Sequence, residues 1–186
     1  MALDDILMEA EEKMEKTEQV VQRDFTGLRT GKASTAIVEN VLVEVYGSQM
    51  RLREVAGITT PEPRMIVIQP WDIGTLQPIE KAIQKANLGL HPAVDKKIIR
   101  ISIPELSTER RLEIVKAAKK MAEDGRVAVR HVRRDSIEAL KKDSKSGAIT
   151  EDELASAEKE IQKLTDAYIA KIDQHLAHKE KELTTV

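Results

Sequence analysis

The 186-residue chain contains no cysteine, which excludes disulfide bridges, thiol chemistry and thiolate metal sites. No apolar run approaches the roughly 20 residues that span a bilayer. The start, Met1–Ile6, is too acidic for a secretory signal or an organellar transit peptide. Together these absences predict a cytoplasmic protein with no membrane segment.

Aromatic residues make up only 2% of the chain: they are Phe25, Tyr46, Trp71 and Tyr168. Recognition of single-stranded nucleic acid by base stacking needs several exposed rings in series. An RNA partner would therefore be bound through its phosphates and its folded shape. Trp71 follows Pro70 in a predicted loop, and we expect its ring to anchor the core rather than to contact a partner.

None of the 8 glycines belongs to a glycine-rich motif that binds phosphate, so the sequence predicts no nucleotide-binding site. His175 and His178 are three residues apart in a predicted helix, but no further ligand lies near them, and solvated helix residues are the better interpretation. Carboxylates are abundant on predicted solvent faces, without any sign of a cleft. We expect a protein that is not an enzyme and that holds no cofactor and no metal.

Positive charge is concentrated in one segment, although the net charge of the chain is −2. Residues 108–149 hold 12 basic and 7 acidic groups, whereas both ends of the chain are acidic. Arg126, Arg130 and Arg133 are spaced four and three apart, so a helix would place them on one face, and Lys119 and Arg134 extend the group. Guanidinium groups suit bidentate phosphate contacts. The pattern indicates a ridge that docks on a polyanion, and a solvated helix face is the alternative.

Three segments carry apolar or small residues at alternating steps of four and three, which predicts helices that pack along one seam. The first should end near Thr30–Gly31, the second should run from about Ser107 to Ser144, and the third should begin at the capping box Thr150–Glu153. No helix can bury such a seam alone, so we expect a long antiparallel three-helix bundle. The predicted seam positions include Leu3, Leu7, Ala10, Met14, Thr17, Val21 and Phe25, then Val115, Ala118, Ala122, Gly125, Val129 and Leu140, and finally Ala157, Ile161, Tyr168 and Ile172. Gly125 lies at a seam position within the second helix, where glycine lowers helix propensity. Close approach of a neighbouring helix explains it, and a functional bend is the alternative.

The middle of the chain predicts a small mixed α/β domain, inserted over residues 31–104 between bundle segments 1–30 and 105–186. Its expected elements are a hairpin at 41–53, strands at 64–69 and 97–103, and a helix at 76–86. Two chain segments would then join the domains as a two-stranded hinge. The predicted hinge residues are Thr30, Gly31, Pro104, Glu105 and Leu106.

Several segments, taken together and in this order, resemble the ribosome recycling factor family. They are residues 29–34 (RTGKAS), 46–47 (YG), 80–83 (EKAI), 88–92 (LGLHP), 104–111 (PELSTERR), 129–135 (VRHVRRD) and 161–166 (IQKLTD). The resemblance implies an L-shaped α+β molecule that binds the post-termination ribosome. With elongation factor G and GTP, a member of this family dissociates the ribosome into subunits, releasing mRNA and tRNA.

The resemblance also implies which residues bind. Arg130 and Arg133 match the arginines expected to touch large-subunit ribosomal RNA, and the secondary candidates are Arg29, Lys32, Arg111 and Arg126. The implied state in solution is a monomer. Two alternatives come from the residues alone: a coiled-coil adaptor that binds an acidic protein partner, and a hydrolase with a carboxylate pair.

Overall fold

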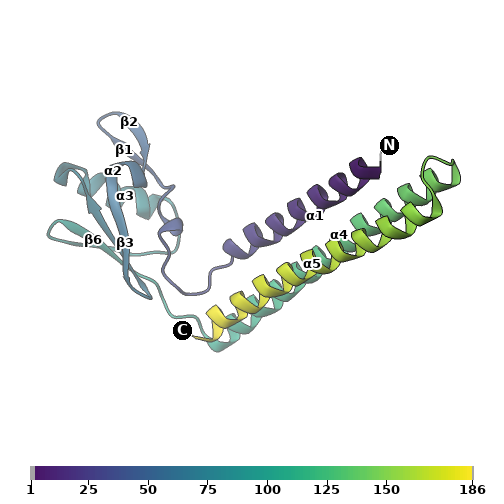
Figure 1. The fold of residues 1–186 in the computed structure, drawn as a ribbon. Coiled ribbons are helices and arrows are strands. Elements are labelled where there is room, and N and C mark those ends of the chain that lie inside the picture. The colour runs from purple at the N-terminus through teal and green to yellow at the C-terminus, as the bar shows by residue number, and fades with distance from the viewer. Residues whose placement is uncertain (1–2, 186) are drawn as a thin grey trace. The chain divides into compact units, whose positions relative to one another are not determined.

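A computed structural model gives the structure of residues 3–185, which divide into two compact units (Figure 1). One unit contains the chain up to Arg29 together with Thr108–Thr185, and the other contains Thr30–Ser107. Long helices build the first unit and β-sheets with short helices build the second, so the fold is α+β. No helix formed by residues 3–185 is long and apolar enough to cross a membrane.

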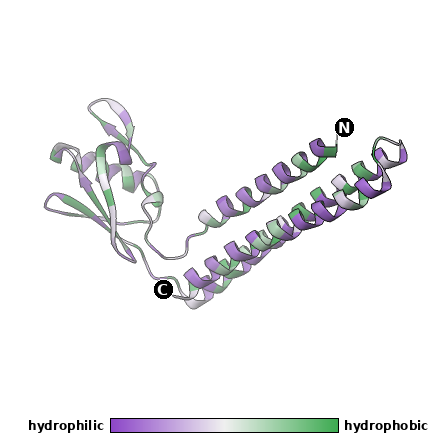
Figure 2. Ribbon diagram, in the orientation of Figure 1, coloured by the Kyte–Doolittle hydropathy of each residue, from purple (hydrophilic) through white to green (hydrophobic). Residues whose placement is uncertain are grey.

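The helical unit consists of α1 (Leu3–Thr26), α4 (Thr108–Lys145) and α5 (Glu151–Thr184), and each helix packs against the other two. Apolar residues recur among hydrophilic ones along all three (Figure 2). The predicted three-helix bundle is confirmed. Its buried residues include Ile6, Ala10, Met14, Val21 and Phe25 of α1, Ala118, Ala122, Val129 and Leu140 of α4, and Ala157, Ile161, Tyr168 and Ile172 of α5.

The predicted end of the first helix was wrong by about one turn, because α1 ends at Thr26. The N–H of Gly27 still donates to the Arg23 carbonyl at 3.2 Å, but the N–H of Leu28 donates to Phe25, three residues back. This tighter turn closes the helix before Gly31. Two seam assignments were also shifted: Ile114 is buried in place of Val115, and Ile6 in place of Leu7.

The start of α5 is the predicted capping box. The Thr150 hydroxyl accepts a hydrogen bond from the Glu153 N–H at 3.2 Å, and a Glu153 carboxylate oxygen accepts from the Thr150 N–H at 2.8 Å. These two bonds satisfy backbone donors that the first turn of a helix leaves without partners. The Thr150 N–H and, second, the Thr150 hydroxyl donate to the Glu153 carboxylate and lower the pKa of Glu153.

The second unit holds a two-stranded hairpin and a four-stranded antiparallel sheet of order β3-β4-β6-β5. Ile66, Ile68, Ile99 and Ile101 alternate along the two central strands and are fully buried. The strands are β1 (Leu42–Val45), β2 (Ser48–Arg51), β3 (Ala56–Glu62), β4 (Met65–Pro70), β5 (Pro92–Asp95) and β6 (Ile98–Ser102). The helices are α2 (Leu52–Val55) and α3 (Leu76–Lys85), with 3-10 turns at Thr35–Ile37 and Ile73–Thr75.

The hairpin, the two central strands and α3 lie where the sequence predicted them, but the edge strands β3 and β5 were missed. β3 contains Gly57 and Pro61, and β5 begins with Pro92, residues that read as breaks. An edge strand tolerates such residues because one side of its backbone needs no partner.

The expectation for Trp71 was wrong, because its side chain is 72% exposed. The ring lies so close to Gly57 that a Cβ at this position would be 3.3 Å from Cη2 of Trp71. Trp71 therefore covers an edge strand instead of anchoring the core.

Candidate nucleic-acid interface

The basic side chains of α4 that recur every seven residues lie on the side of this helix next to α5. Lys119 Nζ lies 3.6 Å from Glu180 Oε1 of α5. Seven and fourteen residues later, Arg126 and Arg133 also reach α5. We call Lys119, Arg126, Arg130, Arg133 and Arg134 the α4 ridge. Because Lys119, Arg126 and Arg133 each contact a side chain of α5, this part of the ridge follows the boundary between the two helices.

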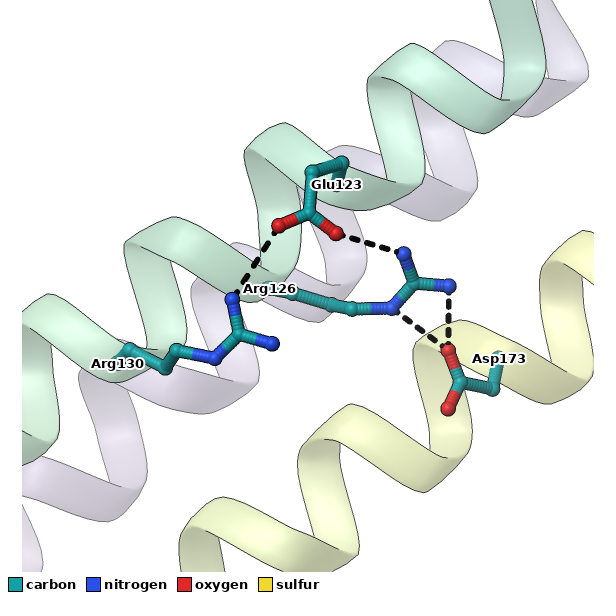
Figure 3. A network of polar contacts seen from close by, with 4 residues as sticks. All are labelled: Glu123, Arg126, Arg130 and Asp173. Carbon is teal, nitrogen blue, oxygen red and sulfur yellow. Dashed lines mark hydrogen bonds and ion pairs between the residues drawn. The ribbon is translucent and has the colours of Figure 1, made fainter.

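Arg126 is held in place by two carboxylates (Figure 3). Its Nη2 and Nε lie 2.6 and 2.7 Å from Asp173 Oδ1, and its Nη1 lies 2.9 Å from Glu123 Oε2. The side chain is only 20% exposed. Burial works against its charged form, but the hydrogen bonds to Asp173 and Glu123 outweigh burial, so the pKa of Arg126 is raised. This guanidinium joins α4 to α5.

Arg130 shares Glu123 with Arg126, as Figure 3 shows. Its Nη1 lies 3.2 Å from Glu123 Oε1, and the two side chains are 45% and 53% exposed. Hydrogen bonds from Arg126 and, second, from Arg130 lower the pKa of Glu123, so it stays ionised at neutral pH. An ion pair this exposed contributes little to stability, so Arg130 can exchange Glu123 for a phosphate at small cost.

Arg133 has a neutral partner. Its Nη1 donates to the Gln162 side-chain oxygen at 3.1 Å, and the Gln162 amide donates in turn to Asp166 at 2.9 Å. No ion pair within residues 3–185 involves Arg133 or its exposed neighbour Arg134, and the buried Nε of Arg133 has no hydrogen-bond partner there. Arg133 is therefore oriented by an amide while its positive charge stays uncompensated.

The sequence predicted that these arginines share one face, and the structure brings Arg126 and Arg130 to one carboxylate. The side chains that contact these arginines were not predicted from the sequence. Glu123 was detectable, because it lies three residues before Arg126 and seven before Arg130, on the same helix face. Asp173 and Gln162 were not, because they follow only from the register between α4 and α5.

Of the secondary candidates, Arg126 belongs to the ridge, and Arg111, Arg29 and Lys32 are not among the residues that form it. Arg111 is half-buried in the first turn of α4, 15 residues before Arg126, which corresponds to roughly 22 Å of helix. Arg29 is exposed at the end of the helical unit's first segment, whereas Lys32 is exposed and belongs to the other unit.

The residues predicted as a hinge all belong to the α/β unit. Gly31 has a φ of +77°, and a Cβ at this position would lie 3.1 Å from Cγ of Leu106. Thr30 is buried, Pro104 is exposed, and Glu105 Oε2 lies 3.3 Å from Arg64 Nη1. The backbone passes from one unit to the other at Arg29–Thr30 and at Ser107–Thr108.

No group of three or more metal-ligating side chains occurs among residues 3–185. His175 Nε2 contacts Glu18 of α1 in a half-buried pair, and His178 Nε2 lies 3.2 Å from Glu182 Oε1. The two histidines therefore make separate contacts with carboxylates of the bundle.

Comparison with known proteins decides the family. The model of the ribosome recycling factor family matches residues 21–184. The chain belongs to the ribosome recycling factor family. It is 50% identical to the ribosome-recycling factor of Oleidesulfovibrio alaskensis over 184 residues, covering 99% of this chain and 100% of that protein. It is 49% identical to that of Thermosynechococcus vestitus over 180 residues, covering 97% and 99%.

Solved structures of the family have the same fold. A solution structure of a ribosome recycling factor matches with a TM-score of 0.79 and 42% identity, covering 100% of this chain and 99% of that one. A second match has a TM-score of 0.66 and 43% identity, covering 98% and 99%. It presents a T. thermophilus ribosome recycling factor and E. coli elongation factor G bound to the E. coli post-termination complex. Family membership makes this chain a non-enzymatic translation factor for ribosome recycling and decides against the adaptor and hydrolase alternatives.

Proposed function

We propose that this recycling factor docks its α4 ridge on large-subunit ribosomal RNA of the post-termination ribosome. Arg133 and Arg130 are the principal phosphate contacts, and Arg134 adds charge beside them. The uncompensated guanidinium of Arg133, oriented by Gln162, is the observation that carries this assignment. Contacts of this kind position a protein without reading sequence.

The remaining basic side chains have secondary roles in binding. Arg126 is committed to Asp173 and Glu123, so it maintains the geometry of the ridge and adds a weaker contact. Arg111, Arg29 and Lys32 supply further positive charge for phosphates at other positions.

Subunit separation requires force, and we propose that elongation factor G provides it by acting on the α/β unit. The energy comes from GTP bound to that partner. The chain would bend where it passes between units, at Arg29–Thr30 and Ser107–Thr108, with Gly31, Pro104, Glu105 and Leu106 moving with the α/β unit. The protein acts as a monomer in the cytoplasm.

The first experiment measures recycling directly. Post-termination ribosomes are incubated with the protein, elongation factor G and GTP, and are then separated by sedimentation. We expect intact ribosomes to convert to free subunits, and conversion should fail when either factor is left out. An unchanged profile with all components present would contradict the proposal.

The second experiment tests the contact residues. Arg133→Ala should lower ribosome affinity about tenfold, which corresponds to losing one charge-assisted contact. Arg23→Ala is the matched control: it removes an exposed arginine from α1 of the same unit. The only ion pair of Arg23 within residues 3–185 is a 3.7 Å contact with Asp24. Both variants should melt like the parent protein. Equal affinity of the two variants would remove Arg133 from the contact.

A further inference from the structure

The α/β unit contains a groove that ribosomal RNA docking on α4 does not use. It lies between the β1–β2 hairpin and α3 and has a volume of about 800 Å³. This volume lies within the range of pockets that bind ligands. Its apolar lining comes from Val41 and Leu42 on the hairpin side and from Pro78, Ala82 and Ala86 along α3.

Apolar surface at this groove is open to solvent. Leu42 is 57% exposed because β1 alternates, burying Val43 and Val45 in the core and turning Leu42 and Glu44 outward. Tyr46, at the tip of the same hairpin, is 82% exposed. Its hydroxyl contacts Asp72, so the hairpin tip is tied to the loop before α3. The groove therefore has an apolar lining that is partly uncovered.

Basic side chains line one wall of the groove and an acidic side chain lines the other. Lys81 and Lys85 lie one helical turn apart on α3 and line one wall. Both are exposed, and neither enters an ion pair within residues 3–185. Glu44 lies on the opposite wall, formed by the hairpin. An occupant needs negative charge along the α3 wall and an apolar face toward Leu42 and Ala82.

We propose that this groove binds an acidic amphipathic segment of a partner protein. Apolar side chains of the segment would cover Leu42 and the α3 alanine positions, while its carboxylates would pair with Lys81 and Lys85. RNA fits less well, because it would leave the apolar lining uncovered and because the Glu44 carboxylate on the hairpin wall repels phosphates. The proposal extends beyond ribosomal RNA docking and does not depend on it.

The test uses the full-length protein and a defined probe. The probe is a synthetic helical peptide of about 16 residues with leucines on one face and glutamates beside them. Backbone amide shifts are followed by NMR during titration, and the expected changes cluster at Leu42, Lys81 and Ala82. A second peptide with glutamine in place of every glutamate should bind about tenfold more weakly.

Charge reversal locates the site. Lys81→Glu combined with Lys85→Glu should weaken peptide binding about tenfold or more. The matched control reverses Lys96 and Lys97, two exposed lysines of the same unit that do not line the groove, and should bind like the parent. Leu42→Ser, which exchanges an exposed side chain, should also weaken binding.

Several outcomes would overturn the proposal: no binding, shifts outside the groove, equal affinity for both peptides, or equal effects of the two charge reversals. Displacement of the peptide from the groove by an RNA oligonucleotide would assign the site to nucleic acid instead. Because recycling is measured separately by sedimentation, failure here leaves the proposed function untouched.

Discussion

A Cβ atom on Gly125 of α4 would lie 2.5 Å from Cγ2 of Val21 on α1. Real Cβ contacts are essentially never this short, so the two helices approach as closely as they do only because residue 125 has no side chain. The same glycine costs α4 about 1 kcal/mol in helix propensity relative to alanine. Tight packing at the centre of the bundle offsets that cost.

Gly125→Ala should therefore destabilise the protein despite the better helix propensity. Overpacking of this kind costs about 1–3 kcal/mol, so we expect a net loss of about 1 kcal/mol in the free energy of unfolding. Urea denaturation followed by circular dichroism measures it. Val21→Ala makes room for the new methyl group, so the double variant should be more stable than the sum of the single effects predicts. Strict additivity would show that the two sites are not in contact.

Glu123→Gln should increase ribosome affinity. Neutralising this carboxylate frees Arg130, and partly Arg126, from an intramolecular competitor of phosphate. Since exposed ion pairs are weak, the expected gain in affinity is about 1.4-fold to fivefold. Binding should also fall more steeply with salt than for the parent. Equilibrium binding to ribosomes at several salt concentrations measures both quantities.

The matched control is Glu109→Gln, which neutralises an exposed carboxylate in the first turn of the same helix, outside the ridge. It should leave the affinity close to that of the parent. If Glu109→Gln raised affinity as much as Glu123→Gln, the effect would come from net charge and not from release of the arginines.

The Tyr46–Asp72 contact should make both groups titrate away from their usual ranges. The Tyr46 hydroxyl and, second, the Gly74 N–H lower the pKa of Asp72, while the hydrogen bond to Asp72 raises the pKa of Tyr46. The stabilisation from Asp72 is present above its unfolded pKa and is lost as pH falls through its lowered folded pKa. The stabilisation from Tyr46 is present below its unfolded pKa and is lost as pH rises through its raised folded pKa.

NMR titration of the Asp72 carboxyl carbon measures the first of these shifts. In Tyr46→Phe the pKa of Asp72 should rise toward its ordinary value, with only the Gly74 contribution left. An Asp72 titration that is the same in both proteins would contradict the contact.

Thr150→Ala should lower the free energy of unfolding by about 1 kcal/mol, because the first turn of α5 loses its cap. The side-chain hydrogen bond that helps to lower the pKa of Glu153 is lost as well, so this pKa should rise. Thr150→Ser keeps the hydroxyl and is the control, with stability near that of the parent. Urea denaturation distinguishes the variants, and equal loss in both would assign the effect to the methyl group of Thr150.

The sequence predicted those parts of the structure that depend on local pattern. The capping box at Thr150, the hairpin turn at Gly47 and the buried seams follow from residues within a few positions of each other. The edge strand β5 and the end of α1 were not predictable in this way. Pro92 indicates the end of a strand unless the strand is known to lie at a sheet edge. Both Gly27 and Gly31 are residues at which a helix can end, and the local sequence does not choose between them.

In the candidate site, too, local patterns were predictable from the sequence and contacts between helices were not. The spacing of Arg126, Arg130 and Arg133 predicted their common face, yet only the packing of α4 on α5 reveals which charges are already compensated. Asp173 lies 47 residues from Arg126 in the sequence, and no pattern connects the two. The exposure of Trp71 was not predictable either, because its ring packs against Gly57 of the edge strand β3, which the sequence did not predict.

The order of elements has a consequence for biosynthesis. Helix α1 buries its seam only against α4 and α5, which begin at Thr108 and Glu151. During translation the whole α/β unit emerges from the exit tunnel before α4 and α5 have been synthesised. The amphipathic helix α1 therefore has no packing partner during this time. The nascent polypeptide thus exposes Met14, Val21 and Phe25 until its last third has been synthesised, and chaperones have that interval in which to bind.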